Sequence, residues 1–218
     1  MKKIPPLYLF LFITCISCAK QGKNIYVEGL VYNPINGSRI EGVELKLSRL
    51  SNSSSVKVLA TSTSSQDGTY ILKANGLLGK QYSVCVSNFP NNYILLDTYS
   101  PSDPGEDLYC EFIKMMQAEI VNVELVPKKT ISVVLNNTNC INTQDSIHVE
   151  LFNEYLKDLY YIKIDKSGCI QNYTEIQPTT EGYTKIYWDV TKNGITNSFS
   201  DSIFVSDSQQ SVTFNIDY

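Results

Sequence analysis

Alternation of apolar and polar residues is the feature that most constrains what this chain can fold into. In GVELKLSRL the apolar side chains of Val43, Leu45 and Leu47 are separated by charged or small polar ones. Successive side chains of a strand point to opposite faces of its sheet, so the segment predicts a strand with one buried face. IYVEGLVY, TYILKA, QYSVCVSN and AEIVNVELV also suit strands. No apolar period of 3.6 residues persists for three turns, although EDLYCEFIKMMQ would allow one short helix. The prediction is an all-β fold.

Turn dipeptides separate these segments. Asn36-Gly37 and Asp67-Gly68 both favour tight hairpin turns, because their residues tolerate positive φ. KNG at residues 192–194 predicts another hairpin turn in the second half.

The apolar pattern restarts after PKK at residues 127–129, which we expect to be a short linker. Strand-like segments then recur about every 10 to 15 residues, which is typical of a β-sandwich. The prediction is two antiparallel β-sandwich domains in tandem. The first spans residues 25–126, and the second, immunoglobulin-like or transthyretin-like, spans residues 127–218.

The first half also carries a family resemblance over about residues 25–87. Its order of Val, Gly, Ile, Leu, Thr, Asp and Tyr positions resembles the carboxypeptidase regulatory-like domain, a transthyretin-like or prealbumin-like β-sandwich with a carbohydrate-binding-like fold. The resemblance implies the fold and no particular activity, since these residues serve turns and core. The matching positions are Val27, Gly29, Val31, Gly37, Ile40, Gly42, Val43, Leu45, Thr61, Thr63, Asp67, Gly68 and Tyr70.

The N-terminus has the features of an export signal. Lys2 and Lys3 precede an apolar run that is too short to span a bilayer, which is typical of a signal peptide. ITCISC resembles a bacterial lipobox, with Cys15 where the family usually has Leu. The resemblance implies a signal peptide of residues 1–17, acylation of Cys18 with chains such as palmitate, and a tether of residues 18–24. A plain signal peptide and a CxxC redox pair are the alternatives.

This export signal predicts a lipoprotein, from a Bacteroidota-like bacterium, whose lipid anchor contacts the membrane. An Asp directly after the acylated cysteine would resemble an inner-membrane retention signal, but this chain has Ala19 there. We therefore expect the protein in the outer membrane, and the sequence leaves open whether it faces the periplasm or the cell surface. The formal net charge is -4, and an acidic chain offers no electrostatic footprint for nucleic acid or anionic lipid.

Catalytic candidates are scarce, because His148 is the only histidine. With a single histidine we expect no Ser-His-Asp arrangement, no His-rich zinc site and no HExxH motif. In SIHVELF the apolar residues are Ile147, Val149 and Leu151, so His148 should lie on the exposed face of a strand. We expect no enzyme activity, no metal and no cofactor.

Four cysteines remain beyond the N-terminal pair. Export places them in an oxidising compartment, and their even number suggests disulfides. Three connectivities are possible, and the domain division favours Cys85–Cys110 and Cys140–Cys169. Each bond would close a loop of roughly 25 to 30 residues, worth about 3 kcal/mol on the chain-entropy model. The alternative is that some are free buried thiols.

Residues 88–111 form the one long irregular stretch, and long loops on compact sandwiches are often functional. Aromatic and acidic side chains together suit sugar binding or Ca²⁺, although the spacing fits no calcium loop. The alternative is a solvated loop with its aromatics packed onto the sandwich. The candidate ligand residues are Phe89, Tyr93, Asp97, Tyr99, Asp103, Glu106, Asp107 and Tyr109.

Two short triplets resemble the Asp-Ser/Thr-aliphatic site for O-glycosylation in Bacteroidota. They would place sugars on Ser146 and Ser202.

Taken together, the sequence predicts a non-catalytic, lipid-anchored envelope protein that presents β-sandwich modules to a partner or ligand. One alternative is a carbohydrate-binding accessory lipoprotein of a glycan-uptake system, with the 88–111 loop as the site. The other is a structural spacer or assembly protein that contacts another envelope protein.

Overall fold

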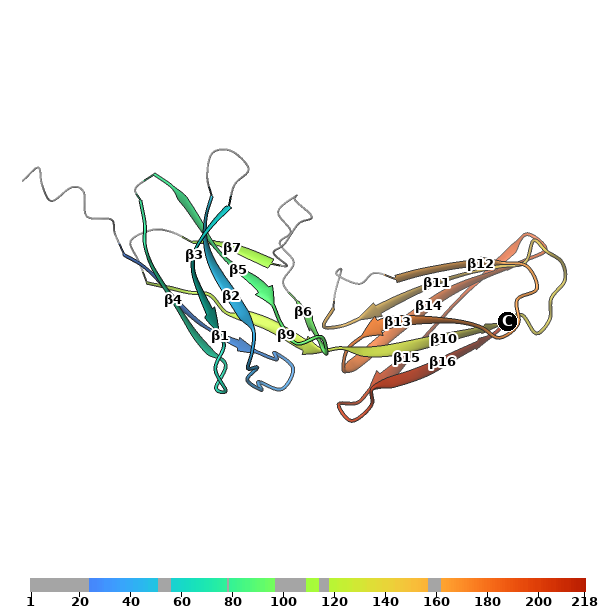
Figure 1. Cartoon of the computed structure of the whole chain (residues 1–218). Coiled ribbons are helices and arrows are strands. Elements are labelled where there is room, and N and C mark those ends of the chain that lie inside the picture. Colours follow the sequence, from blue (N-terminus) through green and yellow to red (C-terminus); the bar gives the residue numbers. More distant parts are fainter. Residues whose placement is uncertain (1–23, 51–55, 78, 97–108, 114–117, 157–161) are drawn as a thin grey trace, which may run out of the picture.

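The computed structural model describes residues 24–50, 56–77, 79–96, 109–113, 118–156 and 162–218. All regular structure in these ranges is β-strand, so the predicted all-β class is confirmed. The strands form four sheets around two hydrophobic cores (Figure 1).

Two sheets enclose the first core. One is a five-stranded sheet with the order β4-β1-β9-β6, in which β8 also pairs with β1. The other has the order β3-β2-β5-β7. The strands of the first sheet are β1 (Asn24–Tyr32), β4 (Thr69–Asn75), β6 (Tyr93–Leu95), β8 (Ala118–Ile120) and β9 (Val123–Pro127). Those of the second are β2 (Glu44–Leu50), β3 (Val56–Thr63), β5 (Gln81–Asn88) and β7 (Tyr109–Ile113).

The alternation in β2 places its apolar face in this core. Val43, Leu45 and Leu47 are all fully buried, as their spacing predicts. Ser48 is buried as well, because a register shift between Leu47 and Ser48 interrupts the alternation. Residues 109–113 form β7, so the expectation of a helix there is wrong: pairing with β5 holds this segment extended.

Two glycines of the first half are required by close backbone approach. A Cβ at Gly29 would stand 1.8 Å from the carbonyl oxygen of Val121. Gly68, with φ of 72°, ends the predicted Asp67-Gly68 turn, and a Cβ there would stand 2.5 Å from the carbonyl oxygen of Val31. Hydrogen bonds from Ser65 and Thr69 to the Asp67 carboxylate order this turn and lower the pKa of Asp67 to about 2.

Two further sheets enclose the second core. One has the order β13-β10-β16 and the other β12-β11-β14-β15. Burial alternates residue by residue along β10 and β11, which places Ile131, Val133 and Leu135 opposite Ile147, Val149 and Leu151 in one core. The strands are β10 (Lys129–Asn136), β11 (Ser146–Asn153), β12 (Ile162–Ser167), β13 (Tyr173–Thr179), β14 (Gly182–Lys192), β15 (Ile195–Val205) and β16 (Ser211–Asp217).

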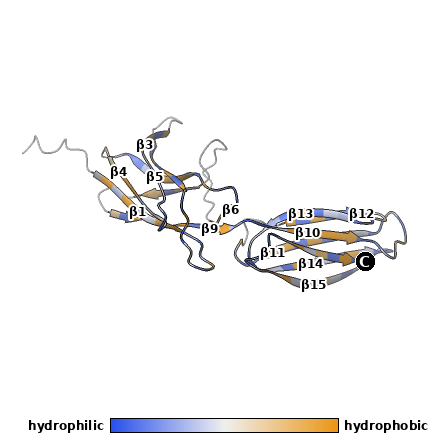
Figure 2. Ribbon diagram, turned by 60° about the horizontal axis from the view of Figure 1, so that its bottom comes forward, coloured by the Kyte–Doolittle hydropathy of each residue, from blue (hydrophilic) through white to orange (hydrophobic). Residues whose placement is uncertain are grey.

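The two cores lie end to end and meet at a packed junction (Figures 1 and 2). Within the expected linker at 127–129, Pro127 ends β9 and Lys129 begins β10, so Lys128 alone lies between the two strands. Lys129 already belongs to β10, and its buried side chain donates a hydrogen bond to the Asp207 carbonyl at 2.5 Å. A third buried cluster joins Ile94 and Val126 of the first half to Leu156 of the second.

Polar contacts also cross this junction. Asn33 of the first half is 1% exposed, and its Nδ2 donates to Oε1 of the buried Glu181 at 3.2 Å. Thr180 Oγ1 donates to the Pro127 carbonyl at 2.7 Å. Because buried polar groups are costly unless they are paired, these bonds specify one arrangement of the two halves.

Parallel pairing joins the first and last strands around each core. In the first, β1 runs parallel to β8 from Tyr26 to Glu28 and parallel to β9 at Val31 and Tyr32. In the second, β10 runs parallel to β16 over seven pairs, Thr130↔Ser211 to Asn136↔Asp217. The chain therefore passes from the far end of the first half through the junction to the far end of the second, where Tyr218 lies (Figure 1).

Candidate interaction surface

The predicted ligand loop is described only at its two ends. Phe89 and Tyr93 are partly buried and pack against the first core. Tyr109 lies in β7. Asp97, Tyr99, Asp103, Glu106 and Asp107 fall outside the described residues, as does Cys18. Ligand binding by this loop stays a prediction.

Both expected cysteine pairings are present. Cys85 and Cys110 are register partners on β5 and β7, with Cα atoms 4.0 Å apart. Cys140 and Cys169 are joined with Cα atoms 5.3 Å apart, beside the loop that leads into β11. The first bond fixes an edge strand to its neighbour, and the second ties two connections of the second half.

The two glycosylation triplets lie in different surroundings. Asp145, before Ser146, is fully buried, and the Ile141 N–H bonds its carboxylate at 2.8 Å and lowers the pKa of Asp145. Ile147, after Ser146, is also buried. Asp201 and Ser202 are both exposed on β15. Modification of either serine stays a prediction, and Ser202 is the more accessible of the two.

His148 lies on the outer face of β11, as the alternation indicates. Its Nδ1 lies 2.5 Å from Asp165 Oδ1, and its Nε2 lies 3.0 Å from Glu150 Oε1. These bonds, that to Asp165 foremost, raise the pKa of His148. Lys163 Nζ lies 3.4 Å from the same Glu150 oxygen, so the group is a network of ion pairs on a sheet face.

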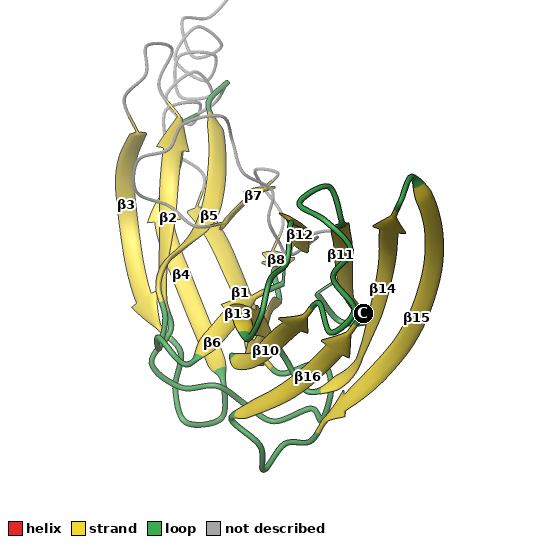
Figure 3. Ribbon diagram, turned by 90° about the vertical axis from the view of Figure 1, so that its right-hand side faces the viewer, coloured by secondary structure: helices red, strands yellow, loops and turns green. Residues whose placement is uncertain are grey.

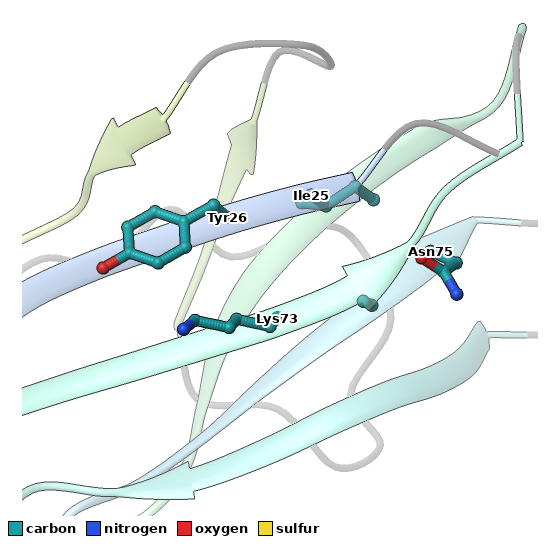
Figure 4. A pocket seen from close by; sticks show the side chains of 5 residues that line it. Ile25, Tyr26, Lys73 and Asn75 are labelled. Atoms are coloured by element: carbon teal, nitrogen blue, oxygen red, sulfur yellow. The ribbon is translucent and has the colours of Figure 1, made fainter. Parts of the chain in front are cut away.

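A concavity of about 480 Å³ lies beside the beginning of β1 (Figure 4). It is lined by Ile25, Tyr26, Lys73, Ala74 and Asn75. Lys73 Nζ stands 5.1 Å from the centre of the Tyr26 ring, and the Tyr26 hydroxyl donates to Glu28 at 2.7 Å. The Lys73 ammonium and the Tyr26 hydroxyl are therefore both engaged with neighbours on β1.

Among the described residues of the second half, the exposed aromatic side chains gather on the hairpin of β14 and β15. Its two-residue turn is Asn193-Gly194, with φ of 50° and 77°, as the sequence predicts. On its outer face Tyr183 is 52% exposed and Phe204 is 54% exposed, with ring centres 5.1 Å apart. Tyr187, 45% exposed, extends the same face.

The inner face of β15 extends beyond the core. Trp188 of β14 is partly buried and stacks on Phe199 of β15, with ring centres 5.7 Å apart, and meets Phe214 of β16 at 5.9 Å. Phe199 is nevertheless 49% exposed, and only Val205 of β15 is buried. We call this exposed inner side of β15 the overhang.

β15 is also the last strand of its sheet. Figure 3 shows it at the outer rim of the second half, and no described strand pairs with its far side. The sequence identified the strand and its turn, but alternation alone does not tell an edge strand from a central one. The β14–β15 hairpin is thus the candidate interaction surface.

Among the described residues, no group of three or more His, Cys, Asp and Glu side chains is arranged to hold a metal ion. The described part of the chain also holds no helix of the length and apolarity needed to cross a membrane.

Comparison with known proteins finds no matching protein family and no matching curated protein. Among solved structures, the chain is similar to the Bacillus anthracis TIE protein, with 11% identity, a TM-score of 0.38, and coverage of 89% of this chain and 34% of that one. GBS52, the minor pilin of Streptococcus agalactiae, gives 11% identity and a TM-score of 0.36, over 88% of this chain and 94% of the pilin. A DUF3823 family protein from Parabacteroides merdae gives 10% identity and a TM-score of 0.34, over 85% and 100%.

The chain thus spans about a third of the TIE protein, and these TM-scores describe a loose likeness between β-rich structures.

Proposed function

We propose that this protein is a non-catalytic spacer of the cell envelope that is lipid-anchored through Cys18 and presents its second sandwich to a partner. In this proposal residues 1–17 are removed, residues 18–24 tether the chain to the outer membrane, and residues 25–126 and 127–218 are two sandwich domains. The first belongs to the carboxypeptidase regulatory-like type, a reading supported by the backbone contact at Gly29 and the positive φ at Gly68.

The junction between the two cores carries the proposal. A binding module on a flexible leash would need no fixed angle between its domains, and such linkers are polar and extended. Here Leu156 is buried against Ile94 and Val126, and Asn33 bonds Glu181 across the same junction. An arrangement that is held by both apolar packing and buried hydrogen bonds suits a role in which distance and orientation matter.

The order of strands supports the same role. β1 begins at the end of the first half that lies away from the junction, so a tether before it would leave the β14–β15 hairpin on the other side of the junction. The exposed aromatic side chains of this hairpin then lie away from the anchor, where a partner can reach them.

The test inserts a six-residue Gly-Ser segment after Lys128 and compares small-angle X-ray scattering of the variant with that of the unaltered protein. We expect one well-defined maximum dimension for the unaltered protein, and a broader distance distribution after the insertion. The same insertion after Asn193, in the hairpin turn, is the control and should leave the distribution unchanged. Equal profiles for all three proteins would contradict the spacer role.

The anchor is tested separately by fractionation. Cys18→Ala should release the protein from the membrane fraction, whereas Cys15→Ala should leave it there. Membrane retention of the Cys18→Ala protein would rule out the lipid anchor.

A further inference from the structure

We propose that β15 pairs antiparallel with β15 of a second copy, in a register centred on Phe199. The inference names the partner of the presented hairpin and in that respect rests on the proposed function. It is argued from the backbone, the overhang and the order of side chains along β15.

The backbone of β15 has a regular set of groups that face away from β14. In a two-residue hairpin the residues that flank the turn, here Lys192 and Ile195, form a hydrogen-bonded pair. The odd-numbered residues of β15 therefore bond β14, and the even-numbered residues from Thr196 to Phe204 direct their N–H and C=O groups outward. The hydroxyl contact of Thr191 with Thr196, at 2.8 Å, fits a pair in the closer, non-bonded position.

One of these outward groups is occupied within the chain. The Ser202 N–H donates to Asp201 Oδ1 at 2.7 Å, which confirms that this N–H points away from β14. Pairing with another strand requires the Asp201 carboxylate to release it. Asp201 then needs another donor, which water or a side chain of the partner can supply.

The overhang supplies the apolar part of the interface. Ile195 is 65% exposed and Phe199 is 49% exposed, on the same side of β15 as Trp188 and the second core. A two-fold axis perpendicular to the sheet keeps the inner faces of both copies on one side, so the two overhangs would cover each other. A strand without apolar residues at these positions would leave both side chains in water.

The side-chain order then selects the register. A pairing centred on Asp201 places two carboxylates opposite each other, which is unfavourable. A pairing centred on Ser200 places Phe199 opposite Asp201. A pairing centred on Phe199 places the two Phe199 rings together, Ile195 opposite Ile203, and Asp201 opposite Asn197, whose amide is the donor that Asp201 needs.

Disulfide trapping tests this register directly. The full chain in detergent, with Cys15 and Cys18 replaced by serine, carries one new cysteine at a time and is oxidised mildly. Phe199→Cys should give a covalent dimer, because side chains in a directly opposite non-bonded pair have Cβ atoms about 5 Å apart. Cys85 and Cys110 show that this chain accommodates such a cross-strand bond.

Controls at neighbouring positions separate register from chance collision. Asn197→Cys and Asp201→Cys should each stay monomeric alone and cross-link when mixed. The proposal would be overturned if Asp201→Cys alone cross-linked as fast as Phe199→Cys. It would also be overturned if none of these proteins cross-linked. The insertion after Lys128 and the fractionation test leave β15 and its turn unaltered, so their results stand apart from this one.

A second variant needs no thiol. Ser200→Pro removes an outward N–H and spares the bonds to β14, a position where edge strands tolerate proline. Sedimentation should show dimers for the unaltered protein and for Ser200→Ala, and monomers for Ser200→Pro with an unchanged thermal midpoint. A dimer that persists in the folded Ser200→Pro protein would show that another surface, or another partner, uses the hairpin.

Discussion

At the scale of single residues, the contacts of His148 link protonation to stability. Both of its ring nitrogens contact carboxylates, those of Asp165 and Glu150, on the outer face of β11. The contacts favour the charged imidazolium and raise the pKa of His148 above its ordinary 6.5. The residue is therefore a source of pH-dependent stability.

We predict that this stability declines in alkaline solution. The folded-state pKa exceeds the unfolded one, so the contribution is complete below pH 6.5 and is lost as the pH rises through the folded-state pKa. A third of the His148 side chain is exposed, so we expect its contribution to the free energy of unfolding to be less than about 1 kcal/mol. Urea unfolding at pH 5.5 and pH 9 should show the difference for the unaltered protein, and a smaller one for His148→Gln. Equal differences in the two proteins would contradict the role of His148.

Gly29 gives a second prediction at this scale. A methyl group at position 29 would clash with the Val121 carbonyl, so Gly29→Ala should lower the free energy of unfolding by about 3 kcal/mol or more. Gly37→Ala is the matched control, because Gly37 has φ of 74° and open space around it. Left-handed strain alone should cost about 1 kcal/mol there. Equilibrium denaturation measures both, and similar losses would mean that the Val121 contact does not matter.

At the scale of elements, the sequence was most informative where one face of a strand is buried. The alternation around Leu45 and the Asn193-Gly194 turn both led to the observed strands. The segment around Phe112 did not, because its apolar residues fit either a helix or a strand. Pairing of β7 with β5 and the Cys85–Cys110 bond decide its conformation, and neither contact is local in sequence.

The position of a strand within its sheet is likewise absent from its own sequence. β15 reads as an ordinary strand, and only the assembled sheet shows that it is an edge with a half-exposed Phe199. The candidate surface was therefore missed, although its exposed polar run of serines was a signal. The predicted ligand loop drew attention for its length, and its two described aromatics, Phe89 and Tyr93, pack on the core.

At the scale of the whole molecule, the junction makes the two halves dependent on each other. Leu156 belongs to the second half of the chain but is buried with Ile94 of β6. Leu156→Ala should therefore accelerate hydrogen exchange of the β6 amides, on the far side of the junction. Leu151→Ala, an equally buried change within the second core, should accelerate exchange in the second half alone. Unchanged β6 exchange in Leu156→Ala would mean that the halves behave independently.

The parallel pairing of first and last strands has a mechanical consequence. If the molecule is pulled between Asn24 and Tyr218, β1 and β9 are drawn in opposite directions along their length, and so are β10 and β16. Their hydrogen bonds lie across the direction of pull, so they are loaded in shear and must break together instead of unzipping one at a time. A chain held by an anchor before β1 and by a partner on the second half would thus resist extension at the first sandwich, with a rate of forced unfolding set by rupture of the pairing between β1 and β9.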